Sequence, residues 1–193
     1  MFASSLFEED WVEPPRGLVY EPGFMSEVEE REMADWIDEQ AWDTAYSRRR
    51  QFYGYSYSKS TPMVEIPSLL GLYATRLLSV GLVLEVPRQV LINEYFPGQG
   101  IAAHVDEMPN LQSQVVTISL LDSYPMLFAH SESGQKYEHW LERRSIAVMS
   151  GESRTDWTHE IEKRKADIIQ GGGRRMRGRR VSITYRTMFE KVG

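Results

Sequence analysis

The chain has no cysteine among its 193 residues, and it has only four histidines: His104, His130, His139 and His159. Without thiols it cannot form a disulfide, a thiolate zinc site, a Cys-ligated iron–sulfur cluster or a cysteine nucleophile. A transition-metal site would therefore need histidine and carboxylate ligands. The sequence also lacks an apolar run of the roughly 18–20 residues that a membrane span needs, and it does not begin like a secretory signal. We expect an intracellular, monomeric protein that does not bind membranes.

Charge of one sign is in modest excess. Asp and Glu number 28 against 22 Lys and Arg, which gives a formal net charge of −6. Such a surface does not attract phosphate backbones indiscriminately. Two local clusters oppose this mean: Arg48-Arg49-Arg50, and five arginines between Arg174 and Arg180. The second cluster follows Gly171-Gly172-Gly173, and the composition of this segment predicts a flexible basic loop.

Local patterns predict helices first and short strands afterwards. Ser26 and Glu29 have the spacing of a capping box, so a helix is expected to run to about Asp38. Pro67 predicts the start of a second helix over residues 68–80. Runs rich in β-branched and aromatic residues predict strands, at 51–58, 89–96, 115–121, 125–129, 145–149 and 180–187. The order favours an α+β fold that is mainly β, an antiparallel sandwich or barrel.

Domain organisation follows from the same patterns. The acidic residues 1–16 are expected to form an N-terminal arm, and residues 17–193 to form a single domain. His130 and His139 fall in a loop-like stretch, 129–140, and are expected at the surface.

A possible metal site begins at Ile101-Ala102-Ala103-His104-Val105-Asp106. In a strand, His104 and Asp106 would lie on the same face, because side chains alternate with a period of two. With His159, which lies 55 positions further on, they would make the two-histidine, one-carboxylate triad of non-heme Fe(II) oxygenases. The alternative is an ordinary hydrogen-bonded histidine and acid.

The segment 180–186 alternates in a way that suggests an anion site. Arg180, Ser182, Thr184 and Arg186 would share one face of a strand. The two arginine Cα atoms would lie roughly 20 Å apart, and guanidinium groups that lean inward from both ends would suit a small dicarboxylate such as 2-oxoglutarate. The alternative is a surface strand with a solvated polar face.

A third segment could serve the same ligand. Asn93 and Tyr95 would share a face of the strand at 89–96, where they would offer an amide and a phenol. The turn Phe96-Pro97-Gly98-Gln99-Gly100 then leads the chain into the segment with His104.

Together these motifs resemble the AlkB family of Fe(II)/2-oxoglutarate dioxygenases over roughly residues 17–187. The matching elements are Asn93-x-Tyr95-x-Pro97-Gly98, His104-x-Asp106, the distal His159 and Arg180-x5-Arg186, preceded by the aromatic run Tyr53-Gly54-Tyr55-Ser56-Tyr57. The similarity looks closest to small bacterial members and to the eukaryotic branch whose AlkB domain acts on tRNA wobble uridines.

The resemblance implies a double-stranded β-helix, or jelly roll, with the N-terminal helices packed on one sheet. It implies an enzyme that uses Fe(II), 2-oxoglutarate and O2, with no catalytic residue beyond the metal site. Fe(II) would be held by His104, Asp106 and His159. The co-substrate 2-oxoglutarate would be held by Asn93, Tyr95, Arg180, Ser182 and Arg186, with Arg180 on its distal carboxylate and Arg186 near the metal.

For the substrate, the resemblance and the two arginine clusters favour nucleic acid, DNA or RNA, that undergoes oxidative demethylation or hydroxylation at alkylated bases or modified tRNA. Tyr55, Tyr57 and Met108 are candidate substrate contacts. A protein hydroxylase or lysine demethylase that uses the same iron site is the alternative, since an acidic protein favours basic partners. A non-catalytic interaction module is a third possibility.

Overall fold

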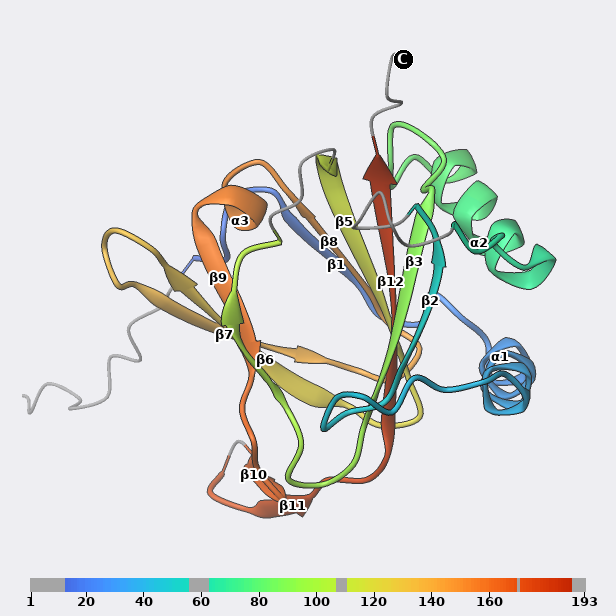
Figure 1. Ribbon diagram of the computed structural model, residues 1–193. Helices are drawn as coiled ribbons and strands as arrows, with labels where there is room; N and C mark the ends of the chain where they lie inside the picture. The colour runs from blue at the N-terminus through green and yellow to red at the C-terminus, as the bar shows by residue number, and fades with distance from the viewer. Residues whose placement is uncertain (1–12, 56–62, 107–110, 170, 189–193) are drawn as a thin grey trace, which may run out of the picture.

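The structure is a computed structural model that describes residues 13–55, 63–106, 111–169 and 171–188. Two antiparallel sheets face each other (Figure 1). The large sheet has the order β1-β8-β5-β12-β3-β2, and the small one has the order β4-β9-β6-β7. A separate hairpin, β10–β11, lies at the bottom end of the two sheets (Figure 1). The strands are β1 (Leu18–Glu21), β2 (Arg50–Gly54), β3 (Gln89–Tyr95), β4 (Ile101–His104), β5 (Leu111–Leu120), β6 (Tyr124–His130), β7 (Lys136–Leu141), β8 (Ile146–Ser150), β9 (Trp157–Ile161), β10 (Ala166–Ile168), β11 (Arg174–Met176) and β12 (Arg180–Met188).

The two predicted helices form as expected and cover the outer face of the large sheet (Figure 1). Helix α1 (Glu27–Glu39) begins with the predicted capping box, in which the Glu29 amide donates to Ser26 Oγ and the Ser26 amide donates to a Glu29 carboxylate oxygen at 2.7 Å. Helix α2 (Ser68–Ser79) follows Pro67. A third, short helix, α3 (Glu152–Thr155), precedes β9. Apolar residues of α1 and α2, including Ile37 and Leu77, form one core with the outer face of the sheet.

Strand β12 runs through the middle of the large sheet between β5 and β3. Its residues Val181, Ile183 and Tyr185 are completely buried in the core shared with the helices. Because side chains alternate along a strand, the polar residues of β12 face the small sheet, and they too are buried. The alternative of a solvated polar face is therefore wrong.

The stretch 129–140 is not a loop. It belongs to the hairpin of β6 and β7, in which Met126 pairs with His139 and Ala129 with Lys136. The alternation in Lys136–Leu141 supports a strand, and Gly134, at φ +70°, allows the tight turn. His139 is half-buried beside Tyr20 and Tyr137, and burial lowers the pKa of its imidazole below the ordinary value. His130 and His139 were predicted to lie in a surface loop, but each belongs to a strand and is partly buried.

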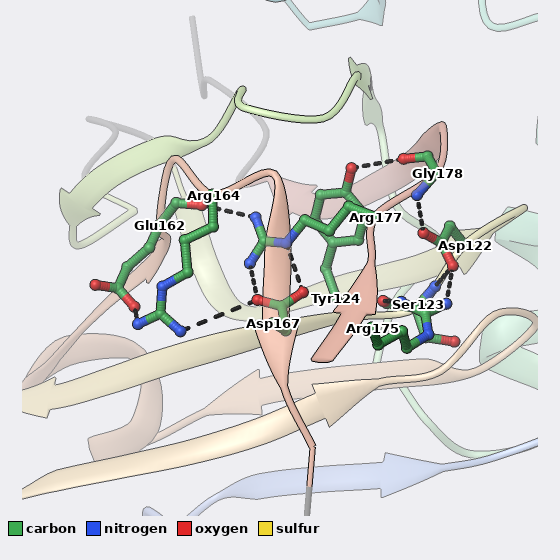
Figure 2. Close-up of polar contacts among 9 residues, drawn as sticks. All are labelled: Asp122, Ser123, Tyr124, Glu162, Arg164, Asp167, Arg175, Arg177 and Gly178. Atoms are coloured by element: carbon green, nitrogen blue, oxygen red, sulfur yellow. Dashed lines mark hydrogen bonds and ion pairs between the residues drawn. The ribbon is translucent and has the colours of Figure 1, made fainter. Parts of the chain in front are cut away.

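The glycine and arginine segment is also more ordered than a flexible basic loop. Gly171 and Gly172, both at positive φ, turn the chain between β10 and β11. Three of the arginines that follow are bound by acids. Figure 2 shows two of them: Arg177 makes two 2.6 Å bonds to Asp167, and Arg175 pairs with Asp122. Arg179 in turn binds Asp38 and Glu94. The basic composition of this segment did not predict these ion pairs, because most of the acids lie far away in the sequence.

No helix in the described ranges is long and apolar enough to cross a membrane. Most of the expected N-terminal arm, residues 1–16, lies outside the described residues, as does the second half of the predicted strand 51–58.

Candidate functional site

His104, Asp106 and His159 come together, with one potential ligand atom from each lying within 4.8 Å of the others. The pairing of β4 with β9 sets His104 directly opposite His159, and the two ring centroids are 4.3 Å apart. The strands can approach this closely because residue 100 is glycine: a Cβ there would lie 2.1 Å from the Ile161 carbonyl oxygen. Two segments 55 residues apart thus build one cluster.

Asp106 reaches the cluster differently from the prediction. Strand β4 ends at His104, so Asp106 is placed by the chain beyond the strand rather than by strand alternation. Two arginines hold it there. Arg186 Nη2 donates to Asp106 Oδ1 at 2.7 Å, and Arg154 Nη1 donates to the Asp106 carbonyl at 3.1 Å.

The protonation states of the cluster suit a divalent metal. Burial lowers the pKa of His159 to about 4, so its imidazole is neutral near pH 7. Burial by itself would raise the pKa of Asp106, but Arg186 and the two histidines outweigh it and hold the pKa below its ordinary value. His104 Nδ1 lies 2.8 Å from the Ala102 carbonyl oxygen, which can only accept, so Nδ1 donates to it and Nε2 is the ring nitrogen left for a metal.

The cluster also has room for an ion. His159 Nε2 and Asp106 Oδ2 are 3.7 Å apart, too far for a hydrogen bond. Two imidazoles and one carboxylate form the donor set of a non-heme Fe(II) centre. The three residues therefore fit an iron ion by chemistry and by spacing.

The cluster opens into a cavity of about 340 Å³ between the two sheets. All eight residues predicted for the metal and the co-substrate line this cavity: Asn93, Tyr95, His104, Asp106, His159, Arg180, Ser182 and Arg186. The predicted co-substrate residues are adjacent because β3 pairs with β12. In this pairing Arg180 lies opposite Tyr95, and Ser182 lies opposite Asn93.

Arg180 has an unusual environment within this cavity. Its side chain is completely buried, and Nη2 makes a 2.8 Å bond to Ser119 Oγ. Its Nε and Nη1 are buried and have no hydrogen-bond partner among the described residues. Burial lowers the pKa of this guanidinium from its ordinary value, but an arginine in a protein stays charged. A buried cation with unused donors calls for an anion.

The three candidate substrate contacts are less well supported. Tyr57 and Met108 lie outside the described residues. Tyr55 is partly buried against the core between the sheets, and its carbonyl accepts a 2.7 Å bond from Gln89 Nε2. It is not among the residues that line the cavity. Two charged lining residues, Arg48 and Arg50, were not assigned to the site, and their only sequence signal is their place in an arginine cluster.

Comparison with known proteins places this fold and site in a class. Residues 17–186 match the model of the 2OG-Fe(II) oxygenase superfamily, and the chain belongs to that family. It is 36% identical over 171 residues to the tRNA (carboxymethyluridine(34)-5-O)-methyltransferase alkbh8 of Xenopus tropicalis, covering 81% of this chain and 27% of that protein. It is 28% identical over 202 residues to the alkylated DNA repair protein ALKBH8 homolog of Arabidopsis thaliana, covering 88% of this chain and 58% of that protein.

A solved structure supports the same fold. The structure of OsALKBH1 matches with a TM-score of 0.65 and 16% identity, over 92% of this chain and all of the other. The prediction of an AlkB-like Fe(II)/2-oxoglutarate dioxygenase with a jelly-roll fold is therefore confirmed. This family consists of oxidoreductases that use Fe(II), 2-oxoglutarate and O2, and the cluster of His104, Asp106 and His159 fits its iron site. The chain spans only about a quarter of the length of the frog relative.

Proposed function

We propose that this chain oxidises a C–H bond on a base of nucleic acid, either as demethylation of an alkylated base or as hydroxylation of a modified one. One observation carries the proposal: the histidine and aspartate cluster shares its cavity with the buried, incompletely bonded Arg180. A metal site and a buried anion receptor in one cavity are what a 2-oxoglutarate dioxygenase requires.

The residues have separate roles in this proposal. His104, Asp106 and His159 hold Fe(II), and Asn93, Tyr95, Arg180, Ser182 and Arg186 hold 2-oxoglutarate. When bound, these groups supply the oxidising power, because decarboxylation of 2-oxoglutarate to succinate activates O2 for insertion into the C–H bond.

Arg180 binds the distal carboxylate through its unused donors. Arg186 occupies Oδ1 of Asp106 and so leaves Oδ2 facing His159. The Ala102 carbonyl keeps the proton of His104 on Nδ1, away from the metal side.

Nucleic acid is the proposed substrate class because of the relatives. The names of the frog and Arabidopsis proteins refer to tRNA and to alkylated DNA. If the same chemistry acts here on an N-methyl group, the hydroxylated product loses formaldehyde and leaves the nitrogen demethylated.

The alternative is a protein hydroxylase or lysine demethylase on the same site, and one observation favours it. Arg49, Arg175, Arg177 and Arg179 are all bound to acids, so the two arginine clusters offer less free positive charge than the sequence indicates.

A succinate-release assay with Fe(II) and 2-oxoglutarate tests both readings. The panel holds N-methylated single-stranded DNA and RNA oligonucleotides and methyl-lysine peptides, and His104→Ala is the inactive control. Stimulation by oligonucleotides supports the proposal, while stimulation by peptides alone replaces the substrate class. Turnover that survives in His104→Ala would reject the metal assignment itself.

A further inference from the structure

The charges that the described residues place around the cavity do not balance. Four arginines of these residues line it, Arg48, Arg50, Arg180 and Arg186, against a single acid, Asp106. Arg186 binds Asp106, and Arg50 binds Asp43 at 2.9 Å. Arg180 and Arg48 remain without a carboxylate partner within the described ranges. The proposed function uses Arg180 for the co-substrate, which leaves the role of Arg48 to be explained.

Arg48 is held by a side-chain hydrogen bond, although no acid among the described residues binds it. Its Nε donates to Asn93 Oδ1 at 3.1 Å, and its guanidinium carbon lies 6.0 Å from the centre of the Tyr95 ring. Asn93 and Tyr95 are themselves proposed co-substrate residues on β3. Arg48 is thus fixed at the edge of the co-substrate site, half-buried, at a point reached both by the cavity and by solvent.

The remaining donors of Arg48 define what it can bind. A guanidinium has five N–H donors in a plane, and the Asn93 bond uses only the one on Nε. The two terminal amino groups have no partner among the described residues, and they present a fork that matches a phosphate or carboxylate. Arg48 comes from the segment before β2, and it is partly exposed, whereas Arg180, which lines the same cavity, is completely buried.

We propose that Arg48 binds a backbone phosphate of the nucleic acid, next to the nucleotide whose base enters the cavity. The inference rests on the proposed function and identifies a specific contact for it. One phosphate bound beside the metal would position the strand, while the base itself carries the chemistry.

The test compares Arg48→Gln with Arg174→Gln, which removes the same charge from an exposed position that does not line the cavity. The probe is the most active single-stranded oligonucleotide of the panel, and its binding is followed by fluorescence anisotropy without oxygen at several salt concentrations. Removal of one phosphate contact should reduce the slope of log K against log salt by about 0.7 and weaken binding about tenfold. Arg174→Gln should change neither, and Arg48→Lys should keep the slope because it keeps the charge.

Two further measurements distinguish a phosphate from other anions. The KM for 2-oxoglutarate in the absence of oligonucleotide should stay within about twofold of wild type in Arg48→Gln. Turnover of the corresponding free methylated nucleoside, which has no phosphate, should be equal in the two proteins.

An unchanged salt slope in Arg48→Gln, a raised KM for 2-oxoglutarate, or an equal loss with the nucleoside would each overturn the phosphate contact while leaving the proposed substrate intact. If wild-type protein decarboxylates 2-oxoglutarate but no oligonucleotide stimulates it, the substrate class fails, and this contact fails with it.

Discussion

Replacement of Arg180 by methionine separates a binding role from a structural one. If Arg180 is a receptor for the co-substrate, the free protein carries a buried charge with unused donors, and an apolar side chain of similar size should be tolerated. Replacing buried charges by apolar groups is often neutral or stabilising by about 1–4 kcal/mol. Against this gain stand the bond to Ser119, about 1–3 kcal/mol if its hydroxyl is left unsatisfied, and weak attraction to the rings of Tyr95 and Tyr124, about 0.5–1 kcal/mol each.

These terms nearly cancel, so Arg180→Met should unfold within about 2 kcal/mol of wild type. For a domain of this size that is a change in Tm of less than roughly 8 °C. The effect of ligand should differ far more. With 2-oxoglutarate at about 100 times its Kd, wild-type protein gains about 2.7 kcal/mol, and Arg180→Met should lose most of that gain. The assay is thermal unfolding with Fe(II) under nitrogen, with and without 2-oxoglutarate.

Arg177 provides a matched control, because it is equally buried and lies over the same Tyr124 ring, but binds Asp167 through two bonds (Figure 2). Arg177→Met leaves the buried Asp167 with only the longer ion pair to Arg164, at 4.0 Å, and should cost about 3 kcal/mol, while the shift produced by 2-oxoglutarate persists. If Arg180→Met is destabilised as strongly as Arg177→Met, or keeps the full ligand shift, the receptor assignment is wrong.

Three further predictions concern the metal cluster and its support. His104→Ala should abolish 2-oxoglutarate turnover but change stability by no more than about 1 kcal/mol, as seen by succinate release and thermal unfolding, because the ring is partly exposed. Gly100→Ala should reduce turnover at least tenfold, since the new Cβ must push β4 away from Ile161; Gly71→Ala, where a Cβ meets nothing, should leave turnover unchanged. For His139, whose folded pKa lies below 6.5, the unfolded chain binds more protons, so the stability of wild type relative to His139→Phe should fall as the pH drops below about 6.5. Urea unfolding at a series of pH values measures this, and a difference that is independent of pH contradicts it.

The parts of the site that the sequence could predict are those that depend on local alternation. In β12, a period of two was enough to group Arg180, Ser182 and Arg186 on one face and the apolar core residues on the other. The same reasoning placed Asn93 and Tyr95 together on β3, and the structure aligns them with β12. Periodicity is a property of each segment, so it survives without knowledge of the partner strand.

Other features depend on partners that no local pattern names. Asp106 was correctly grouped with His104, but its position comes from Arg186 and Arg154 rather than from a strand. The hairpin of β6 and β7 was missed because Ser131-Glu132-Ser133-Gly134 has the composition of a loop, although it makes only the turn. Strand β9, which carries His159, is short, and its own sequence does not predict a strand. Its position comes from pairing with β4 on one side and β6 on the other.

The arginine clusters show why a count of charges along a chain is a poor guide to the charge that a ligand meets. Arg179 binds Asp38 on α1, 141 positions away, and Arg49 binds the fully buried Glu94 on β3. In each of these pairs the acid neutralises the charge that the arginine would present at the surface, and the pair links two separate elements of the fold. Among the described residues, Arg48 is the arginine of the first cluster that binds no acid, and it is also the one that contacts Asn93 inside the cavity. A single cation with unused donors at the cavity favours recognition of one anionic group beside the reacting base over broad attraction to a nucleic-acid backbone.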